Sequence, residues 1–207
     1  MTRVVGITGG IGSGKTTLSQ HLKKTGFLVH ESDKVVSDIY NNPKKGFVRF
    51  IKKNISEGVV KRNKINKKEI TNIIFNNKKF KTKLEKYIHK EVKSCREKFI
   101  KKNTKAKKGV IFVDIPLLLE NKLDKSFDLV VSIISSKKNR TKRVLKNKKF
   151  TKDILKMIFR AQTSDKERRR RSHIIIYNNK TKKDFISNAN KALIYFLKQK
   201  TKKWEKL

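Results

Sequence analysis

The sequence predicts an α/β fold in which a five-stranded, mostly parallel sheet is flanked by helices. Three observations support this prediction. Five short runs are rich in apolar and β-branched residues, as expected for strands buried on both faces. Between them, apolar residues recur every three or four positions, which indicates amphipathic helices. A glycine-rich segment joins the first run to the first helical stretch, which is the connection found in a βαβ unit.

The N-terminal part of the chain contains two of the predicted strands. The first covers Arg3–Thr8 and ends at the glycine-rich segment. Helical spacing then begins at Lys15 and continues to Gly26, a residue type that commonly ends helices. The segment FLVHESD, residues 27–33, supplies a second strand that ends at acidic residues. Strand, loop, helix and strand together predict one βαβ unit.

A lysine-rich helical insertion is expected after NNPKKG at residues 41–46. It contains KKEITNIIF at 67–75 and a longer helix from Lys79 to about Asn103. The longer helix carries one apolar stripe, formed by Leu84, Ile88, Val92, Cys95 and Phe99. This pattern indicates a helical subdomain inserted into the sheet.

The C-terminal half restores the strand signals. Strands are predicted within VIFVD at 110–114, FDLVVSII at 127–134 and HIIIYNN at 173–179. Helical periods occupy Lys138–Arg171, with a break near KNKKF. A closing helix is marked by Ile186, Ala189, Leu193, Phe196 and Leu197.

Composition limits the class of protein. The 207 residues carry a formal net charge of +39, which by itself is compatible with phosphate contacts to nucleic acid. The lysines are spread through nearly every helical stretch beside many asparagines and isoleucines, as in adenine- and thymine-rich genes, so we interpret them as a solvated surface. A lone cysteine cannot form an intramolecular disulfide, and neither a signal peptide nor an apolar run of about 20 residues is found. We expect one soluble, cytoplasmic domain with insertions.

The segment GGIGSGKT at residues 9–16 has the pattern glycine, four residues, glycine, lysine, threonine, between a predicted strand and a predicted helix. Glycines let the backbone turn its N–H groups inward, and a helix start adds a positive dipole end. Lys15 would reach the β- and γ-phosphates, and the Thr16 hydroxyl would bind Mg²⁺. A glycine turn without a ligand is the alternative. The predicted nucleotide site consists of Gly12, Ser13, Gly14, Lys15, Thr16 and Thr17.

Two aspartates follow predicted strands. Asp33 ends the second strand and Asp114 ends VIFVD, and the carboxyl ends of strands face the ligand crevice of an open α/β sheet. Asp33 is either a functional carboxylate, which would orient an acceptor hydroxyl, accept its proton or hold Mg²⁺ through water, or the N-cap of a helix that begins at Lys34. Asp114 has the same two interpretations, and a role linked to Mg²⁺ is favoured.

Phosphate binding alone does not separate kinases from GTPases, motors and passive binders. A GTPase normally reads guanine with Asn-Lys-x-Asp after a strand. NKLD at 121–124 has that pattern but follows IPLLLE instead of a strand. The sequence therefore disfavours a GTPase.

Several segments, in order, resemble the dephospho-CoA kinase family. GITGGIGSGKTT at 6–17 resembles its nucleotide loop, and SD at 32–33 falls where the family has its catalytic aspartate. IIFNN and LEKYIHKEV resemble helices of its substrate domain. VDIPLLLE at 113–120 is similar to its most distinctive internal motif, and RAQTSDKERRRRSHIIIYNN at 160–179 is similar to a later segment with a glutamine and a strand ending in asparagine.

The resemblance implies a P-loop kinase fold with the strand order 2-3-1-4-5. The implied parts are a core at about 1–33, 108–136 and 172–207, a helical CoA-binding insertion at about 34–107 and a mobile lid at about 137–171. It also implies transfer of the γ-phosphate of ATP to the ribose 3′-hydroxyl of dephospho-CoA, with Mg²⁺. A monomer or small homo-oligomer without a membrane or a specific nucleic-acid partner is expected.

The resemblance also implies roles for single residues. Asp33 becomes the base, Lys15 the phosphate clamp and Thr16 the Mg²⁺ contact. Thr8, just before the loop, falls on a family active-site position. Arg143 matches a lid arginine that would neutralise the transferring phosphate.

The chain departs from the family in its lid and in its substrate helix. Asn147 stands where the family often has a second lid arginine, and Lys146, Lys148 or Lys149 would have to supply charge instead. Lysine lacks the planar fork with which arginine grips phosphate. HK at 89–90 replaces His-Pro, so His89 is either a substrate contact or one more polar residue beside the apolar stripe.

Two other functions stay open at this stage. A related nucleoside or nucleotide kinase would act on AMP or a nucleoside and ignore dephospho-CoA. A basic NTP-binding protein associated with nucleic acid would bind RNA or DNA in a salt-sensitive way.

Overall fold

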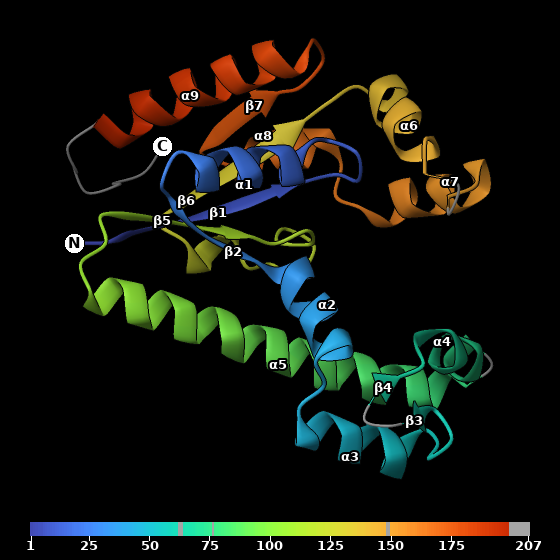
Figure 1. Ribbon diagram of the computed structural model, residues 1–207. Helices are drawn as coiled ribbons and strands as arrows, with labels where there is room; N and C mark the ends of the chain where they lie inside the picture. Colours follow the sequence, from blue (N-terminus) through green and yellow to red (C-terminus); the bar gives the residue numbers. More distant parts are fainter. Residues whose placement is uncertain (62–63, 76, 148–149, 199–207) are drawn as a thin grey trace. The chain divides into compact units, whose positions relative to one another are not determined.

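A computed structural model describes residues 1–61, 64–75, 77–147 and 150–198 (Figure 1). The strands are β1 (Arg3–Gly9), β2 (Leu28–Glu31), β3 (Val60–Lys61), β4 (Lys64–Ile65), β5 (Val110–Asp114), β6 (Leu129–Ile134) and β7 (Ile174–Tyr177). The helices are α1 (Lys15–Lys24), α2 (Ser32–Asn41), α3 (Lys45–Asn54), α4 (Lys67–Phe75), α5 (Lys78–Lys105), α6 (Lys137–Leu145), α7 (Lys152–Ala161), α8 (Asp165–Arg171) and α9 (Lys182–Lys198), with the 3₁₀ turn η1 (Asp124–Ser126). Within these ranges, no helix combines the length and the apolar composition that a bilayer crossing requires.

The main sheet has five strands in the order β2-β5-β1-β6-β7. Counted along the chain without β3 and β4, which form a separate pair, this is the order 2-3-1-4-5, so the predicted order is confirmed. The central strand β1 runs parallel to β5, with Val5 opposite Phe112, and parallel to β6, with Ile7 opposite Val131. β6 in turn runs parallel to β7. Since parallel strands end at one edge of a sheet, the glycine loop after β1 and the end of β5 lie at the same edge, which is where ligands bind in open α/β sheets.

One face of the sheet is covered by α1 and α9 (Figure 1). Val5 and Ile7 of β1 point to this face and belong to one buried cluster with Leu18 of α1 and Phe185 of α9. Side chains alternate along a strand, so Gly6 points to the opposite face. A Cβ added at Gly6 would lie 2.7 Å from Leu118 Cδ1, which shows that the segment following β5 covers that second face closely.

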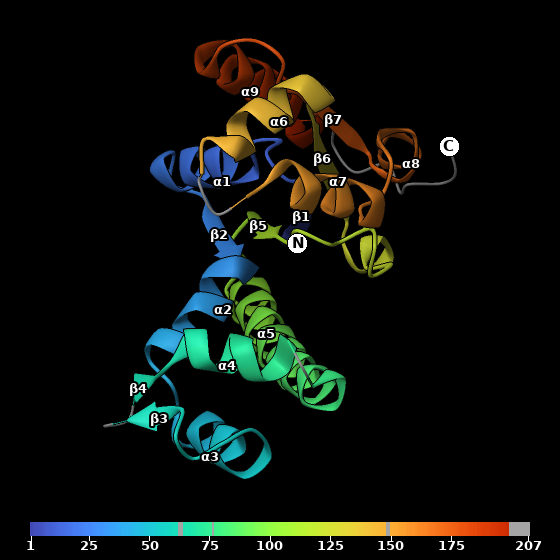
Figure 2. The same cartoon turned by 90° about the vertical axis from the view of Figure 1, so that its right-hand side faces the viewer.

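The chain forms two compact units, one of Met1–His30 and Asn103–Leu207 and the other of Glu31–Lys102. The second, helical unit has its own buried core, formed by Phe47, Ile51, Val59, Ile70 and Leu84. Figure 2 shows the short β3–β4 pair between α3 and α4 in this unit. The sequence did not predict this pair, because strands of two residues are too short to show an alternating pattern.

The helix after β2 corrects one interpretation of Asp33. α2 begins at Ser32, its N-cap is the extended Glu31, and no side chain caps its first turn. The N-cap role considered for Asp33, with a helix beginning at Lys34, is therefore wrong. Because β2 passes directly into α2 at Glu31, Asp33 already lies inside the first helical turn.

The segment expected to form a lid contains α6, α7 and α8. Thr151 and Ser164 are the N-caps of α7 and α8, and each hydroxyl accepts a backbone N–H hydrogen bond of 3.2 Å. Lys148 and Lys149, considered as lid cations, lie outside the described residues, as do the side chains of Phe196 and Leu197.

Candidate nucleotide-binding site

The glycine loop connects β1, which ends at Gly9, to α1, which begins at Lys15. Gly12 and Gly14 have φ angles of +71° and +112°, which glycine adopts readily and other residues rarely adopt. Gly14 is the N-cap of α1 and makes no side-chain hydrogen bond to the first turn. The N–H groups that open α1 therefore have no side-chain cap and can bind an anion.

Two residues from distant elements bind carbonyl groups of the loop. Arg143 of α6 donates from Nη1 to Gly12 O at 3.2 Å, and Asn178 donates from Nδ2 to Ser13 O at 2.7 Å. Arg143 Nη2 also donates to Asn178 O at 2.9 Å and to its Oδ1 at 3.1 Å, and burial lowers the pKa of Arg143. These bonds hold the loop through the carbonyl groups of Gly12 and Ser13. The phosphate contact predicted for Arg143 stays a prediction, since both of its terminal nitrogens bind protein atoms here.

The first half of the loop lies against Arg140 and Gln162. Ile11 N–H donates to Gln162 Oε1 at 3.0 Å. A Cβ added at Gly10 would collide with Arg140 Nη1 and would lie 3.2 Å from Gln162 Oε1. Gly10 is thus the residue that lets an arginine and a glutamine approach the loop closely. Gln162 is the glutamine of the segment that resembles the family, but its bond to the loop and the place of Arg140 could not be predicted, because both residues lie more than a hundred positions away in the sequence.

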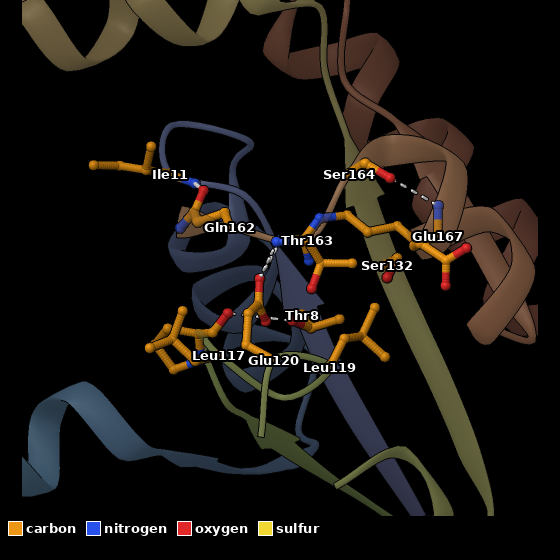
Figure 3. A network of polar contacts seen from close by, with 12 residues as sticks. Thr8, Ile11, Leu117, Leu119, Glu120, Ser132, Gln162, Thr163, Ser164 and Glu167 are labelled. Carbon is orange, nitrogen blue, oxygen red and sulfur yellow. Dashed lines mark hydrogen bonds and ion pairs between the residues drawn. The ribbon is translucent and has the colours of Figure 1, made fainter. Parts of the chain in front are cut away.

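A buried ion pair holds the chain next to Gln162. Figure 3 shows Thr163 N–H donating to Glu120 Oε1 at 2.8 Å, and the same oxygen accepts from Arg168 Nη2 at 2.9 Å. Burial opposes ionisation of Glu120, but the bonds from Thr163 and the charge of Arg168 outweigh it and keep the pKa of Glu120 below its usual value. Arg168 is 0% exposed, although its run of four arginines looks like a surface segment. The motif containing Glu120 is therefore connected to the loop through Thr163 and Gln162.

Thr16 and Asp114 suit a Mg²⁺ site in which phosphate oxygens and water would supply the remaining ligands. Ser19 lies one turn after Thr16 on the same face of α1, and its Oγ donates to Asp114 Oδ2 at 2.8 Å, so Asp114 lies beside that face. The described residues contain no group of three or more His, Cys, Asp and Glu side chains that could hold a metal. Mg²⁺ commonly uses one or two protein oxygens together with phosphates and water, so a hydroxyl and a carboxylate suit it. The buried Thr8 instead donates from Oγ1 to Pro116 O at 3.3 Å, which ties the end of β1 to the segment after β5.

The helical unit holds Asp33, His89 and a cavity. Asp33 is exposed in the first turn of α2, and His89 is exposed on α5. The cavity has a volume of about 540 Å³ and does not include His89 in its lining. It is lined by Lys34, Val35, Asp38, Ile39, Asn42, Lys44, Phe47, Tyr87, Glu91 and Cys95. This cavity could not be predicted from the sequence, because its lining comes from helices that only the tertiary fold brings together.

Comparison with known proteins identifies relatives along most of the chain. Residues 3–184 match the family described as dephospho-CoA kinase. The dephospho-CoA kinase of Fusobacterium nucleatum subsp. nucleatum is 31% identical over 189 residues, which cover 91% of this chain and 95% of that protein. The dephospho-CoA kinase of Bartonella henselae is 29% identical over 198 residues, covering 95% and 97%.

Two solved structures share the fold. The dephospho-CoA kinase from Campylobacter jejuni has a TM-score of 0.73 at 24% identity and covers 96% of this chain and 98% of its own. The shikimate kinase from Acinetobacter baumannii in complex with shikimate has a TM-score of 0.53 at 16% identity and covers 97% of each chain. At these identities the likeness concerns the arrangement of helices and strands alone.

Proposed function

The chain belongs to the dephospho-CoA kinase family, and from this premise we propose how its residues transfer the γ-phosphate of ATP to the ribose 3′-hydroxyl of dephospho-CoA, the last step of coenzyme A synthesis. The chain is an ATP-dependent kinase, as the sequence predicted. One observation carries the assignment of roles: the N–H groups that open α1 have no side-chain cap, while Arg143 and Asn178 hold the loop through Gly12 O and Ser13 O, so those N–H groups can bind phosphate.

On the donor side, we assign the phosphates of ATP to the segment Gly12–Thr17, through the N–H groups other than that of Ser13, which donates to Gly10 O at 3.1 Å, and to the ammonium of Lys15. Mg²⁺ would be held by the Thr16 hydroxyl and, directly or through water, by Asp114, and when bound it neutralises charge on the β- and γ-phosphates. Phosphoryl transfer requires little covalent chemistry from the protein, so fixed positions and charges supply most of the catalysis. Arg143 contributes by holding Gly12 in place.

On the acceptor side, we assign Asp33 as the base that takes the proton of the 3′-hydroxyl while the bond from the γ-phosphorus to ADP breaks and the bond to O3′ forms. The cavity of the helical unit suits part of dephospho-CoA, because Lys34 and Lys44 supply positive charge for phosphate and Tyr87 supplies an aromatic surface. His89 is assigned to the same substrate as an exposed contact outside this cavity.

A product assay tests this function. The protein is incubated with ATP and Mg²⁺ and with dephospho-CoA, AMP, adenosine or RNA in separate reactions. ADP release is followed by a coupled enzyme assay, and the product is identified by mass and by ³¹P NMR. We expect coenzyme A from dephospho-CoA and no stimulation by RNA. A phosphorylated product from AMP or adenosine alone would contradict the proposal.

The Asp33→Asn variant tests the proposed base. Loss of general-base catalysis costs about 10²–10⁴-fold in rate, so we expect kcat to fall by that factor while the affinity for ATP is kept. The matched control is Asp153→Asn, which neutralises an exposed carboxylate in the first turn of α7. If the Asp33 variant turns over as fast as this control, Asp33 is not the base.

A further inference from the structure

The helix α6 carries two arginines, Arg140 and Arg143, that differ sharply in their partners. They are three residues apart and therefore lie on neighbouring positions of one helix face. Both terminal nitrogens of Arg143 are engaged, because they donate to Gly12, Ser135 and Asn178. Arg143 thus acts as a brace of the loop and has no terminal nitrogen left over for a ligand in this arrangement.

Arg140 has a charge without a strong partner. Its side chain is only 12% exposed, and its Nη2 lies 3.6 Å from Asp165 Oδ2, which is longer than a hydrogen bond. Its Nε is buried and has no hydrogen-bond partner in the part of the chain that the structure describes. The guanidinium lies 4.9 Å from the ring centroid of Phe159, a contact that orients it but gives its Nε no acceptor. A buried guanidinium with an unpaired donor is costly, and an anion would offset that cost.

The place of Arg140 relative to the loop identifies the anion. A Cβ at Gly10 would collide with Arg140 Nη1, so the guanidinium lies directly on the loop. Gly10 lies in the first part of the loop, directly after β1, whereas Gly14 lies at its other end, directly before α1. In a phosphate loop the backbone N–H groups cradle the inner phosphates and a side-chain cation reaches the outer ones, so a guanidinium that lies on Gly10 is placed for the terminal phosphate.

We propose that Arg140 is the arginine that binds the γ-phosphate and neutralises it during transfer, in place of the lid arginine that this chain lacks at Asn147. This inference rests on the proposed kinase function. Arg140 donates hydrogen bonds through its planar fork and gains or loses no proton; the γ-phosphoryl group passes from ATP to O3′, and ADP leaves. Phe159 and Asp165 keep the guanidinium in place before ATP binds.

The test compares the wild type with Arg140→Gln and Arg140→Lys. The matched control is Lys138→Gln, which removes an exposed charge from the same helix. We measure kcat with dephospho-CoA, and by calorimetry the affinities for ADP and for the non-hydrolysable analogue AMPPNP. An arginine that stabilises a transferring phosphate is worth about 10³–10⁵-fold in rate when supplied in full, so we expect Arg140→Gln to lose at least about 10²-fold in kcat. Arg140→Lys keeps the charge without the planar fork, so its kcat should lie between those of the wild type and Arg140→Gln.

The nucleotide affinities separate a phosphate contact from a structural role. We expect Arg140→Gln to bind AMPPNP at least about fivefold more weakly, since one charge-assisted bond is lost, and to bind ADP as the wild type does. Equal losses for ADP and AMPPNP, or a kcat equal to that of Lys138→Gln, would overturn the proposal. Formation of coenzyme A by the wild type tests the kinase function separately. A failure of the role proposed for Arg140 is therefore distinguishable from a failure of the proposed kinase function.

Discussion

The ion pair between Glu120 and Arg168 gives the most quantitative prediction. Arg168 is 0% exposed and the Glu120 side chain is 15% exposed, with 2.9 Å between Arg168 Nη2 and Glu120 Oε1. Removing one partner of a buried pair costs about 3–5 kcal/mol, because the other charge is left buried. Arg168 has little to replace Glu120, since its Nε and Nη1 find no hydrogen-bond partner among the described residues. We therefore expect Glu120→Gln and Arg168→Met each to lower the free energy of unfolding by about 3–5 kcal/mol.

A double-mutant cycle, followed by urea denaturation and thermal melting, measures this pair. For a chain of this size, each kcal/mol corresponds to about 2–4 °C, so each single variant should melt roughly 6–20 °C lower. The double variant should lose less than the sum of the singles, with a coupling of about 1–3 kcal/mol. The control is Arg170→Met, whose pair with Glu167 is 70% and 41% exposed and should contribute less than about 1 kcal/mol. Additive losses, or equal losses at positions 168 and 170, would refute the reasoning.

Three further variants, at two positions, test contacts of the loop and of the sheet edge. Gln162→Leu leaves Ile11 N–H without its acceptor and should lower the free energy of unfolding in urea by about 1–3 kcal/mol. Gln162→Glu keeps an acceptor and should lower it less. Equal losses for the two variants would show that this hydrogen bond does not contribute to stability. His173 Nδ1 accepts a hydrogen bond of 3.0 Å from Val130 N–H, and burial lowers the pKa of His173. A histidine in the unfolded chain has a pKa of about 6.5. Just below that pH, the folded protein therefore binds fewer protons than the unfolded chain. Stability should therefore fall as pH drops from about 7 to 5, and His173→Asn should flatten that slope; an unchanged slope in urea titrations would exclude His173 as its source.

The sheet and the glycine loop could be predicted because their signals are local. The run RVVGIT is apolar and β-branched and leads directly into the glycines, and β1 extends one residue beyond the predicted Arg3–Thr8, to Gly9. VIFVD is one uninterrupted apolar run ending in an acid, and the structure gives β5 the same bounds. Since such strands are buried on both faces, continuous apolar runs identify them without knowledge of their neighbours.

The partners of the arginines could not be predicted, because long-range contacts decide them. Arg168 stands in DKERRRR, a stretch with no apolar periodicity, yet it is 0% exposed because Glu120 lies 48 positions earlier in the chain and faces it. Arg143 looked like a phosphate ligand, and its contacts with Gly12 and Asn178 span 131 and 35 positions. A sequence reports residue type and spacing, whereas the role of a guanidinium depends on which acceptors the fold brings to it.

The large net charge of the protein has to be distinguished from the few charges that contact the phosphates. At physiological ionic strength exposed charges are screened beyond about 8 Å, so most of the +39 acts only on nearby solvent and weakly on ATP. Arg140 differs from an exposed lysine such as Lys138 because it is largely buried, and a buried charge is screened much less. If this reasoning holds, removing Arg140 changes kcat far more than removing Lys138, although both substitutions lower the net charge by one. Burial and contact with the loop, and not the number of cations, then determine how strongly the protein stabilises the transferring phosphate.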